Sequence, residues 1–359
     1  KAHETNCGNV RTPMAMRKVA AIDGQGRISV IEEPVAAPKP GQVQIEVAAS
    51  MVSPGTELGG VKRRRENPSD AAPRPFGYSN AGVVVAQGAG CEDIPLGTRV
   101  ACMGGGYAQH ATHACVPRNM AVHIPDGVSD EDASSIHLVA TALNAVRRGA
   151  FQLSEHIAVA GLGLVGQFTC QWARISGCYV MGLDQLPMRL KKATTCGLLR
   201  GVNITEEDPV EVSKIFTRGY GIDGGVIAFG GDGTPAFITL SKMIKKAPDT
   251  HLMGRIVIVG GARIEHGFAS ALGNLDVRSA ARTGPGYHDE EWEHGADYPP
   301  VFMQWTTRRN LEECLRFMDS EHLKVAPLIT HRVALDDAPE ACEELIQNPN
   351  AALGVVFLP

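Results

Sequence analysis

The sequence predicts an α/β protein with two domains, a small β-rich domain and a doubly wound domain built on a parallel sheet. Its 359 residues exceed what one compact core usually holds, which favours two domains. Residues 16–150 show the alternating apolar pattern and frequent turn residues of short strands. From residue 151 onward, continuous aliphatic strands alternate with helical stretches, as in parallel sheets that helices cover on both faces.

The β-rich part contains three clear strand patterns and one helix pattern. Val43, Ile45 and Val47 alternate with polar residues, which predicts a half-buried strand. The strands are expected over residues 43–47, 82–86 and 99–102. A helix is expected over residues 129–148, because acidic residues fill its first turn and two arginines its last, as the helix dipole favours.

The second part contains four aliphatic strands. They are expected over residues 157–160, 179–183, 225–229 and 255–259. We assign residues 151–287 to this domain and expect residues 288–359 to return to the first domain. The last part holds two helical patterns and a closing strand, over residues 307–320, 338–346 and 354–357. Residues 1–15 fit neither domain and are interpreted as an N-terminal extension or a tag remnant.

A glycine-rich loop, Gly161-Leu-Gly-Leu-Val-Gly166, follows the first aliphatic strand and opens a helix. In this context the motif predicts a dinucleotide-binding site. Gly161 permits a tight turn, Gly163 lets the backbone approach a pyrophosphate, and Gly166 lets helix and strand pack closely. At the start of the helix, the backbone N–H groups of Leu164 and Val165 are then available to the phosphates.

Asp184 ends the next strand, about twenty residues after the loop, where an acid that binds the adenosine ribose is expected. A carboxylate accepts hydrogen bonds from both ribose hydroxyls and repels the extra phosphate of NADP, which favours NAD as the cofactor. Arg189, a few residues further on, could weaken that repulsion. We also assign Gly230 and Gly260, which follow the third and fourth aliphatic strands, to the cofactor site.

With these features, the chain from residue 16 to residue 359 resembles the medium-chain dehydrogenase/reductase superfamily, which includes the zinc alcohol dehydrogenases. The motifs that carry the resemblance are Pro40-Gly-Gln-Val, Gly97-Thr-Arg-Val, Val122-His-Ile-Pro-Asp-Gly-Val-Ser129, Thr141-Ala-Leu-Asn-Ala, the glycine loop and residues 225–231. The resemblance implies a GroES-like catalytic domain interrupted by a Rossmann domain, with the active site in the cleft between them. It also implies a homodimer, paired near residues 272–277, or a homotetramer.

The positions that hold the catalytic zinc in zinc-dependent members carry different residues here. Ser53 stands in place of a cysteine and Tyr78 in place of a histidine, while the third position is His137. The four-cysteine lobe of a structural zinc is also missing. Serine and neutral tyrosine are poor zinc ligands, so the sequence predicts no metal. The segments Ser53-Pro-Gly-Thr-Glu57 and Arg282-Thr-Gly-Pro-Gly286 resemble a zinc-free branch, which suggests a sugar or cyclitol substrate.

Without zinc, a side chain must take the proton that an alcohol loses on oxidation. His137 is the first candidate, because the ordinary pKa of histidine is near neutrality. Tyr78 could donate a hydrogen bond to the substrate oxygen, and Ser53 and Glu57 could relay the proton or orient the other groups. Each has a structural alternative: His137 as a satisfied helix residue, Tyr78 as packing, and Ser53 and Glu57 as backbone caps. His110 could border the cleft, but its pattern favours a strand residue.

Composition argues against nucleic acid, membranes and a disulfide framework. The formal net charge of −5 gives no bulk attraction to nucleic acid or anionic membranes, and no apolar run is long enough to span a membrane. The nine cysteines include no Cys-x-x-Cys pair, which argues against a disulfide framework and favours the cytoplasm. The expected partner is therefore a small molecule, a sugar-like alcohol or ketone.

Three functions remain, and the sequence favours the first. This is NAD-dependent oxidation of a secondary alcohol without zinc. The second is a zinc-free reductase of activated double bonds, resembling quinone or enoyl reductases, which needs an oxyanion donor such as Tyr78 and usually prefers NADPH. The third is a redox-sensing or structural protein without activity. The aromatic-rich segment 284–305 could either line the substrate site or form a subunit interface.

Overall fold

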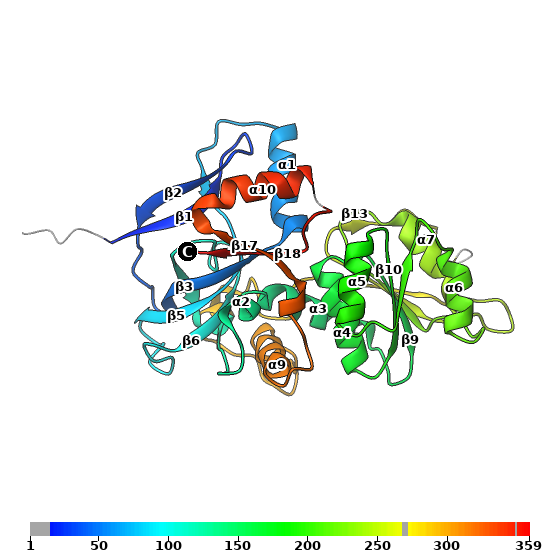
Figure 1. Cartoon of the computed structure of the whole chain (residues 1–359). Coiled ribbons are helices and arrows are strands. Elements are labelled where there is room, and N and C mark those ends of the chain that lie inside the picture. Colours follow the sequence, from blue (N-terminus) through cyan, green and yellow to red (C-terminus); the bar gives the residue numbers. More distant parts are fainter. Residues whose placement is uncertain (1–14, 268–271, 349) are drawn as a thin grey trace, which may run out of the picture.

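The computed structural model describes residues 15–267, 272–348 and 350–359. Apart from residue 15, the expected N-terminal extension lies outside these residues. The chain forms two lobes that lie side by side (Figure 1). It passes from the first lobe to the second and then returns, so that its last strand lies in the first lobe.

The first lobe is built on a sheet that combines strands from both ends of the chain. Its strands have the order β17-β18-β3-β5-β6-β8, and β7 also pairs with β3, while a smaller sheet has the order β2-β1-β4. The bounds are β1 Met16–Ile22, β2 Ile28–Pro34, β3 Gln42–Val52, β4 Arg74–Pro75, β5 Ser79–Gln87, β6 Arg99–Met103, β7 His113–Pro117, β8 Ala121–His123, β17 Ile329–Ala334 and β18 Gly354–Leu358. Val43, Ile45 and Val47 of β3 are all buried, as their alternation predicted.

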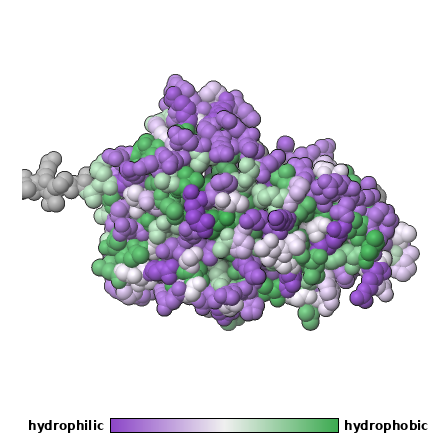
Figure 2. Space-filling model, viewed as in Figure 1, coloured by the Kyte–Doolittle hydropathy of each residue, from purple (hydrophilic) through white to green (hydrophobic). Residues whose placement is uncertain are grey.

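Helices cover this sheet from several directions. Their bounds are η1 Pro54–Leu58, α1 Gly59–Glu66, η2 Arg118–Met120, α2 Asp130–Ala133, α3 Ile136–Gly149, α8 Glu290–Glu293, α9 Thr307–Asp319, η3 Ala326–Leu328, η4 Leu335–Asp337 and α10 Ala338–Gln347. Leu345 of α10 and Val61 of α1 share one apolar cluster with Phe357 of β18. Hydrophilic side chains gather on the outer side of α1 and α10 (Figure 2).

The second lobe is a doubly wound α/β domain on a six-stranded parallel sheet. The strands have the order β11-β10-β9-β12-β14-β16. The bounds are β9 His156–Ala160, α4 Leu164–Ile175, β10 Tyr179–Asp184, α5 Pro187–Thr195, β11 Arg200–Asn203, α6 Pro209–Phe216, β12 Gly224–Ile227, β13 Gly231–Asp232, α7 Thr234–Met243, β14 Arg255–Val259, β15 Ala262–Arg263 and β16 Asp276–Ala280. The order reverses between β9 and β12, which is where such folds bind ligands.

One predicted element differs in the structure. The helix expected over residues 129–148 is two helices, α2 and α3, separated at Ser134 and Ser135. The hydroxyl of Ser134 donates to the carbonyl of Glu131 (2.7 Å), and that of Ser135 donates to the carbonyl of Asp132 (2.6 Å). These side-chain bonds compete with the helical backbone pattern, so the α-helix is interrupted between α2 and α3.

The two lobes meet mainly through α3 and α4. The indole N–H of Trp172 on α4 donates to the carbonyl of Val139 on α3 (3.1 Å). Gln171 makes two hydrogen bonds with the backbone of Lys324, at 2.9 and 2.7 Å. Within the described ranges, no helix is both long and apolar enough to cross a membrane.

Candidate functional site

The glycine loop lies at the carboxyl end of β9, where α4 begins. Gly161 has a φ of +88°, and a Cβ atom there would lie 2.7 Å from the ring of Phe229. A Cβ on Gly166 would lie 1.8 Å from the carbonyl oxygen of Gly161, so this contact excludes any side chain. A Cβ on Gly163 would meet no heavy atom within 4 Å. The loop therefore turns sharply, packs against its own helix and leaves room on one side for a phosphate group.

Two further glycines extend this open edge. Gly230 follows β12 and Gly260 follows β14, and a Cβ atom on either would meet no heavy atom within 4 Å. Because β9, β12 and β14 are neighbours in the sheet, both glycines lie along the same edge as Gly163. The backbone there can approach a bound dinucleotide without obstruction by side chains.

Asp184 ends β10 beside the loop, but its carboxylate is already bound to the backbone. The N–H of Leu162 donates to Oδ2 (2.7 Å) and the N–H of Leu186 donates to Oδ1 (2.9 Å). The Nη1 atom of Arg189 lies 3.6 Å from Oδ2, and Asp184 is only 5% exposed. Only the remaining lone pairs of these oxygens are therefore left to accept bonds from ribose hydroxyls.

Aromatic side chains from three segments meet in the first turn of α3. His137 lies in that turn, Tyr78 precedes β5, and Tyr287 follows β16. The ring centroids of Tyr78 and His137 are 4.4 Å apart, and those of His137 and Tyr287 are 5.9 Å apart. The structure thus brings together the three positions that hold zinc in zinc-dependent relatives, because Ser53 also neighbours Tyr78. It also places one residue of the aromatic-rich segment beside them.

His137 is surrounded by rings rather than by water. Burial lowers the pKa of His137 to about 4, the charge of His288 lowers it further, and only a hydrogen bond with the Tyr78 backbone opposes this. Its Nδ1 atom is buried and has no hydrogen-bond partner among the described residues. The expected near-neutral pKa is therefore wrong, because the rings disfavour the charged form. At neutral pH the imidazole is neutral and can accept a hydrogen bond at Nδ1.

Tyr78 keeps its proton in this environment. Burial raises the pKa of Tyr78 above its ordinary value, and the charge of Glu57 raises it further, while the neighbouring hydroxyls of Ser53 and Thr56 oppose the shift. The phenol is therefore a hydrogen-bond donor and not a base.

A short π-helix, η1, follows β3 and turns Glu57 inward. Such turns are frequent at functional sites. Glu57 is 9% exposed, and its Oε2 atom accepts a hydrogen bond from the N–H of Ser53 (2.7 Å). The Glu57 carboxylate thus caps the backbone, as its structural alternative held, whereas the Ser53 side chain makes no cap hydrogen bond. The carboxylate also lies close enough to influence Tyr78.

His110, which the sequence pattern favoured as a strand residue, completes the contacts of Glu57. It lies in a bend outside the strands and is fully buried. Its Nε2 atom lies 3.2 Å from Oε1 of Glu57, and its Nδ1 atom lies 2.8 Å from the hydroxyl of Ser50. The expected strand placement is wrong, and no local signal could have paired residues 53 positions apart.

The three expected ligand positions do not form a zinc site. Ser53 offers a hydroxyl and Tyr78 a protonated phenol, so only His137 offers a nitrogen. A tetrahedral zinc site needs thiolate, imidazole or carboxylate ligands, usually three or four of them. In the part of the chain that the structure describes, no three histidine, cysteine, aspartate or glutamate side chains are placed to hold a metal. The donor chemistry therefore does not fit a catalytic zinc.

The sequence is similar to dehydrogenase-like proteins over most of its length. It is 25% identical over 366 residues to the uncharacterized zinc-type alcohol dehydrogenase-like protein YphC of Escherichia coli K12, covering 91% of this chain and 95% of that protein. It is 26% identical to a sorbitol dehydrogenase of Halalkalibacterium halodurans, over 56% of this chain and 66% of that one. It is 28% identical to a quinone oxidoreductase of Salmonella typhimurium, over 42% and 47%. No family model matches the chain.

Solved structures share the fold along nearly the whole chain. A dehydrogenase structure from Sinorhizobium meliloti 1021 bound to NADP has a TM-score of 0.77 and 20% identity, covering 96% of this chain and all of that one. A short chain alcohol dehydrogenase from Escherichia coli CFT073 in complex with NADH has a TM-score of 0.74 and 18% identity, with the same coverage. These likenesses show a GroES-like domain joined to a Rossmann domain.

Proposed function

Since this chain belongs to the medium-chain dehydrogenase/reductase superfamily, we propose that it oxidises a secondary alcohol with NAD and without zinc. The substrate we propose is a sugar or cyclitol-like alcohol. The observation that carries this proposal is the unpartnered Nδ1 atom of His137, a buried acceptor beside the protonated phenol of Tyr78. Buried polar atoms normally have a partner, and a substrate hydroxyl would supply one here.

Alcohol oxidation moves a hydride and a proton to different acceptors. A nicotinamide ring, when bound, supplies the acceptor for the hydride that leaves the carbinol carbon. The hydroxyl proton passes to Nδ1 of His137, which becomes imidazolium while the carbinol becomes a ketone. The phenol of Tyr78 donates a hydrogen bond to the substrate oxygen and holds it near His137. A low pKa does not prevent this step, because an alcohol becomes strongly acidic as its hydride leaves.

Glu57 and Ser53 have a supporting role in this proposal. The carboxylate of Glu57 is fixed from one side by the N–H of Ser53 and from the other by His110. Burial keeps the neighbouring Tyr78 protonated, and the charge of Glu57 raises the pKa of Tyr78 further. We therefore assign Glu57 and Ser53 to the orientation of Tyr78, with His137 as the proton acceptor.

NAD is the proposed cofactor because Asp184 places a carboxylate beside the glycine loop. Each of its oxygens accepts one backbone N–H and keeps a further lone pair for the ribose hydroxyls. The charge opposes the additional phosphate of NADP. Arg189 works against this preference, because its guanidinium lies 3.6 Å from the carboxylate.

A second candidate function is the reduction of an activated double bond. The protonated phenol of Tyr78 favours it, because such a reaction needs an oxyanion donor and no base. The similarity to a quinone oxidoreductase is compatible with it. Under this alternative the Nδ1 atom of His137 has no assigned role, so we favour alcohol oxidation. A non-catalytic redox sensor is the third candidate, and no observation favours it.

The assembly and location expected from the sequence stay proposals. In the described part of the sheet, β16 pairs only with β14 and forms one edge. A second copy could pair along this edge in a homodimer or homotetramer. We keep the cytoplasm as the proposed location, with a small sugar-like alcohol or ketone as the partner.

The proposal is tested on purified protein with a panel of polyols and cyclitols. NADH formation is followed with NAD and with NADP, and the metal content is measured on the same sample. We expect oxidation with NAD that persists after treatment with a chelator, at much less than one zinc per chain. Loss of activity on chelation and its recovery with zinc would contradict zinc independence. Reduction of quinones or enones without alcohol oxidation would favour the second candidate.

A further inference from the structure

The loop that follows β16 has an unusual backbone conformation. Arg282 and His288 have φ values of +61° and +75°, and Gly284 and Gly286 between them have values of +133° and +104°. Residues other than glycine rarely adopt this conformation, and it persists where surrounding contacts enforce it. Such positions cluster at ligand sites.

Contacts from α3 and α9 hold the backbone of the loop. The amide of Asn144 on α3 donates to the carbonyls of Ala281 (3.0 Å) and Arg282 (3.1 Å). On α9, the amide of Asn310 donates to the carbonyl of Thr283 (2.7 Å). The backbone is thus fixed independently of the exposed side chains that it carries.

The hydrogen bonds from Asn144 of α3 also place the loop beside the proposed site. Asn144 lies seven residues after His137, so the two side chains lie on the same face of α3, about 10 Å apart along its axis. Tyr287 lies between this part of the loop and His137. Its ring lies 5.9 Å from that of His137, and its hydroxyl accepts a hydrogen bond from the N–H of Gly105 (2.8 Å).

The loop presents two basic groups next to this tyrosine. The guanidinium carbon of Arg282 lies 6.0 Å from the ring centroid of Tyr287, and the imidazole of His288 stacks on that ring at 3.9 Å. Both basic residues are exposed. Within the described ranges, neither side chain makes an ion pair or a hydrogen bond.

Among the described residues, no carboxylate lies within ion-pair distance of the Arg282 guanidinium or the His288 imidazole. Glu293 is 4% exposed and accepts a hydrogen bond from the backbone N–H of His288 (2.8 Å). Glu57 is buried and bonded to Ser53 and His110. The Arg282 guanidinium is therefore an exposed cation beside Tyr287 that has no direct counter-ion among the described residues, although the whole chain has a net charge of −5.

We propose that the alcohol substrate carries an acidic group, a carboxylate or a phosphate, which Arg282 binds beside His288. This inference rests on the proposed function. A guanidinium binds either group through paired hydrogen bonds, and both partners here are free to form them. Such contacts would position the carbinol carbon of an acidic sugar derivative next to His137. The two basic residues of the loop determine the substrate class, while His137 and Tyr78 act on the hydroxyl.

The test compares three substrates with one carbon skeleton: sorbitol, gluconate and sorbitol 6-phosphate. We expect at least one of the two anions to have a KM about tenfold or more below that of sorbitol. Arg282→Gln should raise that KM about tenfold, with kcat changed less than about threefold and the Kd for NADH unchanged. Arg316→Gln is the matched control, because Arg316 is an exposed arginine of α9 that already pairs with Glu313. The better anion distinguishes carboxylate from phosphate recognition.

Binding is measured as well, so that the test does not depend on turnover. Inorganic phosphate is titrated by calorimetry into the NADH-loaded protein, and we expect weak binding that Arg282→Gln abolishes. Equal KM values for sorbitol and both anions, or an anion preference that Arg282→Gln leaves unchanged, would overturn the inference while leaving the proposed function intact. No phosphate binding beside a low KM for gluconate would assign the carboxylate. A weaker NADH affinity in Arg282→Gln with unchanged KM would also overturn it, because Arg282 would then bind the cofactor. Failure to oxidise any alcohol, with phosphate binding retained, would instead count against the proposed function.

Discussion

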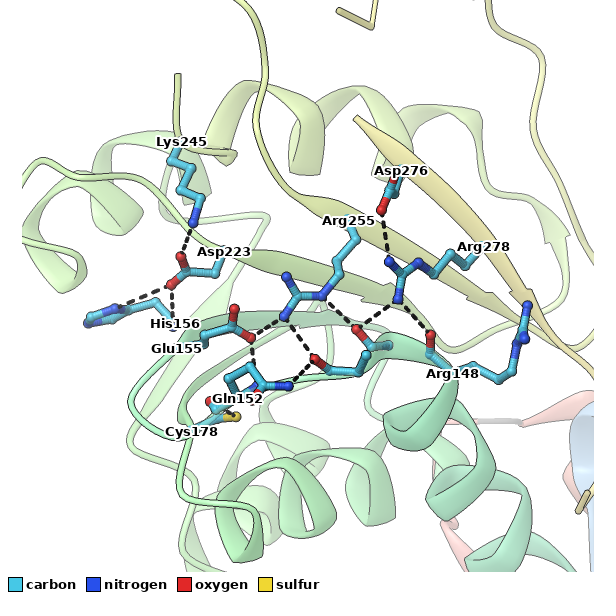
Figure 3. A network of polar contacts seen from close by, with 12 residues as sticks. Arg148, Gln152, Glu155, His156, Cys178, Asp223, Lys245, Arg255, Asp276 and Arg278 are labelled. Carbon is cyan, nitrogen blue, oxygen red and sulfur yellow. Dashed lines mark hydrogen bonds and ion pairs between the residues drawn. The ribbon is translucent and has the colours of Figure 1, made fainter. Parts of the chain in front are cut away.

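The amino edge and the carboxyl edge of the parallel sheet differ in whether their buried polar atoms have hydrogen-bond partners. At the amino edge, charged side chains bind one another and the backbone in a continuous network (Figure 3). Asp223 accepts hydrogen bonds from the backbone N–H of His156 (2.9 Å) and from Lys245 (2.6 Å), while Arg255 pairs with Glu155 and donates to the carbonyl of Gly149 (2.6 Å). No member of this network is among the buried side-chain atoms that lack a partner in the described residues.

At the carboxyl edge and around His137, some buried polar atoms lack a hydrogen-bond partner among the described residues. Nδ1 of His137 and Nε of Arg189 are buried without partners, and glycines keep the backbone open. A group left in this condition weakens the protein unless something else satisfies it. The polar groups of the amino edge therefore satisfy one another, whereas a bound ligand would supply the missing partner of His137 under the proposed function. Substitutions at the two edges should therefore affect different measurements.

The largest effect is expected for His137→Ala. Loss of the proton acceptor should lower kcat/KM for alcohol oxidation by about 10²- to 10⁴-fold. The melting temperature should fall only modestly, because the variant loses the packing of the imidazole against Tyr78 and Tyr287 but also removes an unpartnered buried nitrogen. Both are measured on the same preparation. A variant that melts normally and keeps full activity would remove His137 from the mechanism.

The same residue predicts the acid limb of the pH profile. Oxidation requires neutral His137, so activity is present above its folded pKa of about 4 and is lost as the pH falls through that value. The kcat/KM for oxidation should therefore show no histidine-like decline near pH 6.5, the ordinary value. The profile is recorded with enzyme that recovers full activity on return to neutral pH, which excludes unfolding. A limb with an apparent pKa near 6.5 would show that His137 is more hydrated than its surroundings indicate.

A smaller loss of cofactor affinity is expected for Gly166→Ala. The added Cβ would overlap the carbonyl oxygen of Gly161 at 1.8 Å and displace the loop. NADH binding should weaken about 10- to 100-fold, as displacements near 1 Å commonly do at such sites. Gly59→Ala is the control, because a Cβ at Gly59 meets no heavy atom within 4 Å. Equal NADH affinities for the two variants would argue that the loop does not hold the cofactor.

Cofactor preference should shift by about tenfold in Asp184→Asn. Removing the charge removes roughly 1–4 kcal/mol of repulsion toward the phosphate of NADP, of which solvent and Arg189 offset part. The ratio of kcat/KM values for NAD and NADP should fall accordingly. Arg189→Gln should move this ratio in the opposite direction. If neither substitution changes the ratio, the discrimination lies elsewhere in the site.

At the amino edge, Asp223→Asn should affect stability alone, by about 1–3 kcal/mol in urea unfolding at neutral pH. Burial opposes ionisation of Asp223, yet the hydrogen bonds from Lys245 and the His156 N–H hold its pKa below the ordinary value. This stabilisation is present above the ordinary pKa and is lost as the pH falls through the lower folded pKa. The difference from the native chain should therefore shrink below about pH 4. Asp249→Asn, at an exposed aspartate, serves as the control, and a large fall in kcat for Asp223→Asn would contradict the division between the edges.

Much of the second lobe followed from local pattern. The strands expected over 157–160 and 255–259 match β9 and β14 within one residue. The loop that begins at Gly161 opens α4 where the motif predicted a helix. Parallel strands and glycine turns are encoded by neighbouring residues, because a buried strand needs continuous apolar side chains. The local pattern did not indicate the edge strand β16, since its sequence Asp-Val-Arg-Ser-Ala is mostly polar and exposed, and only the resemblance placed a pairing strand near residues 272–277.

The candidate site was predictable only as a set of positions. The resemblance named Ser53, Tyr78 and His137, and the structure brings the rings of Tyr78 and His137 into contact. The resemblance could not show that aromatic rings shield His137 or that His110 contacts Glu57. Both depend on segments far apart in the chain, and the pKa of a side chain depends on whatever the fold places around it.

The sequence by itself determined the two-domain architecture, the turn at Gly161 and the absence of thiolate ligands at the former zinc positions. These are properties of residue type and local order, which folding does not change. Only the tertiary structure decided how the side chains around His137 are solvated, charged and hydrogen-bonded. Solvation, strain at Arg282 and the unpartnered nitrogen of His137 arise from contacts between distant segments. The sequence therefore determines which residues form the candidate site, whereas the packing around them determines their pKa values and hydrogen bonds.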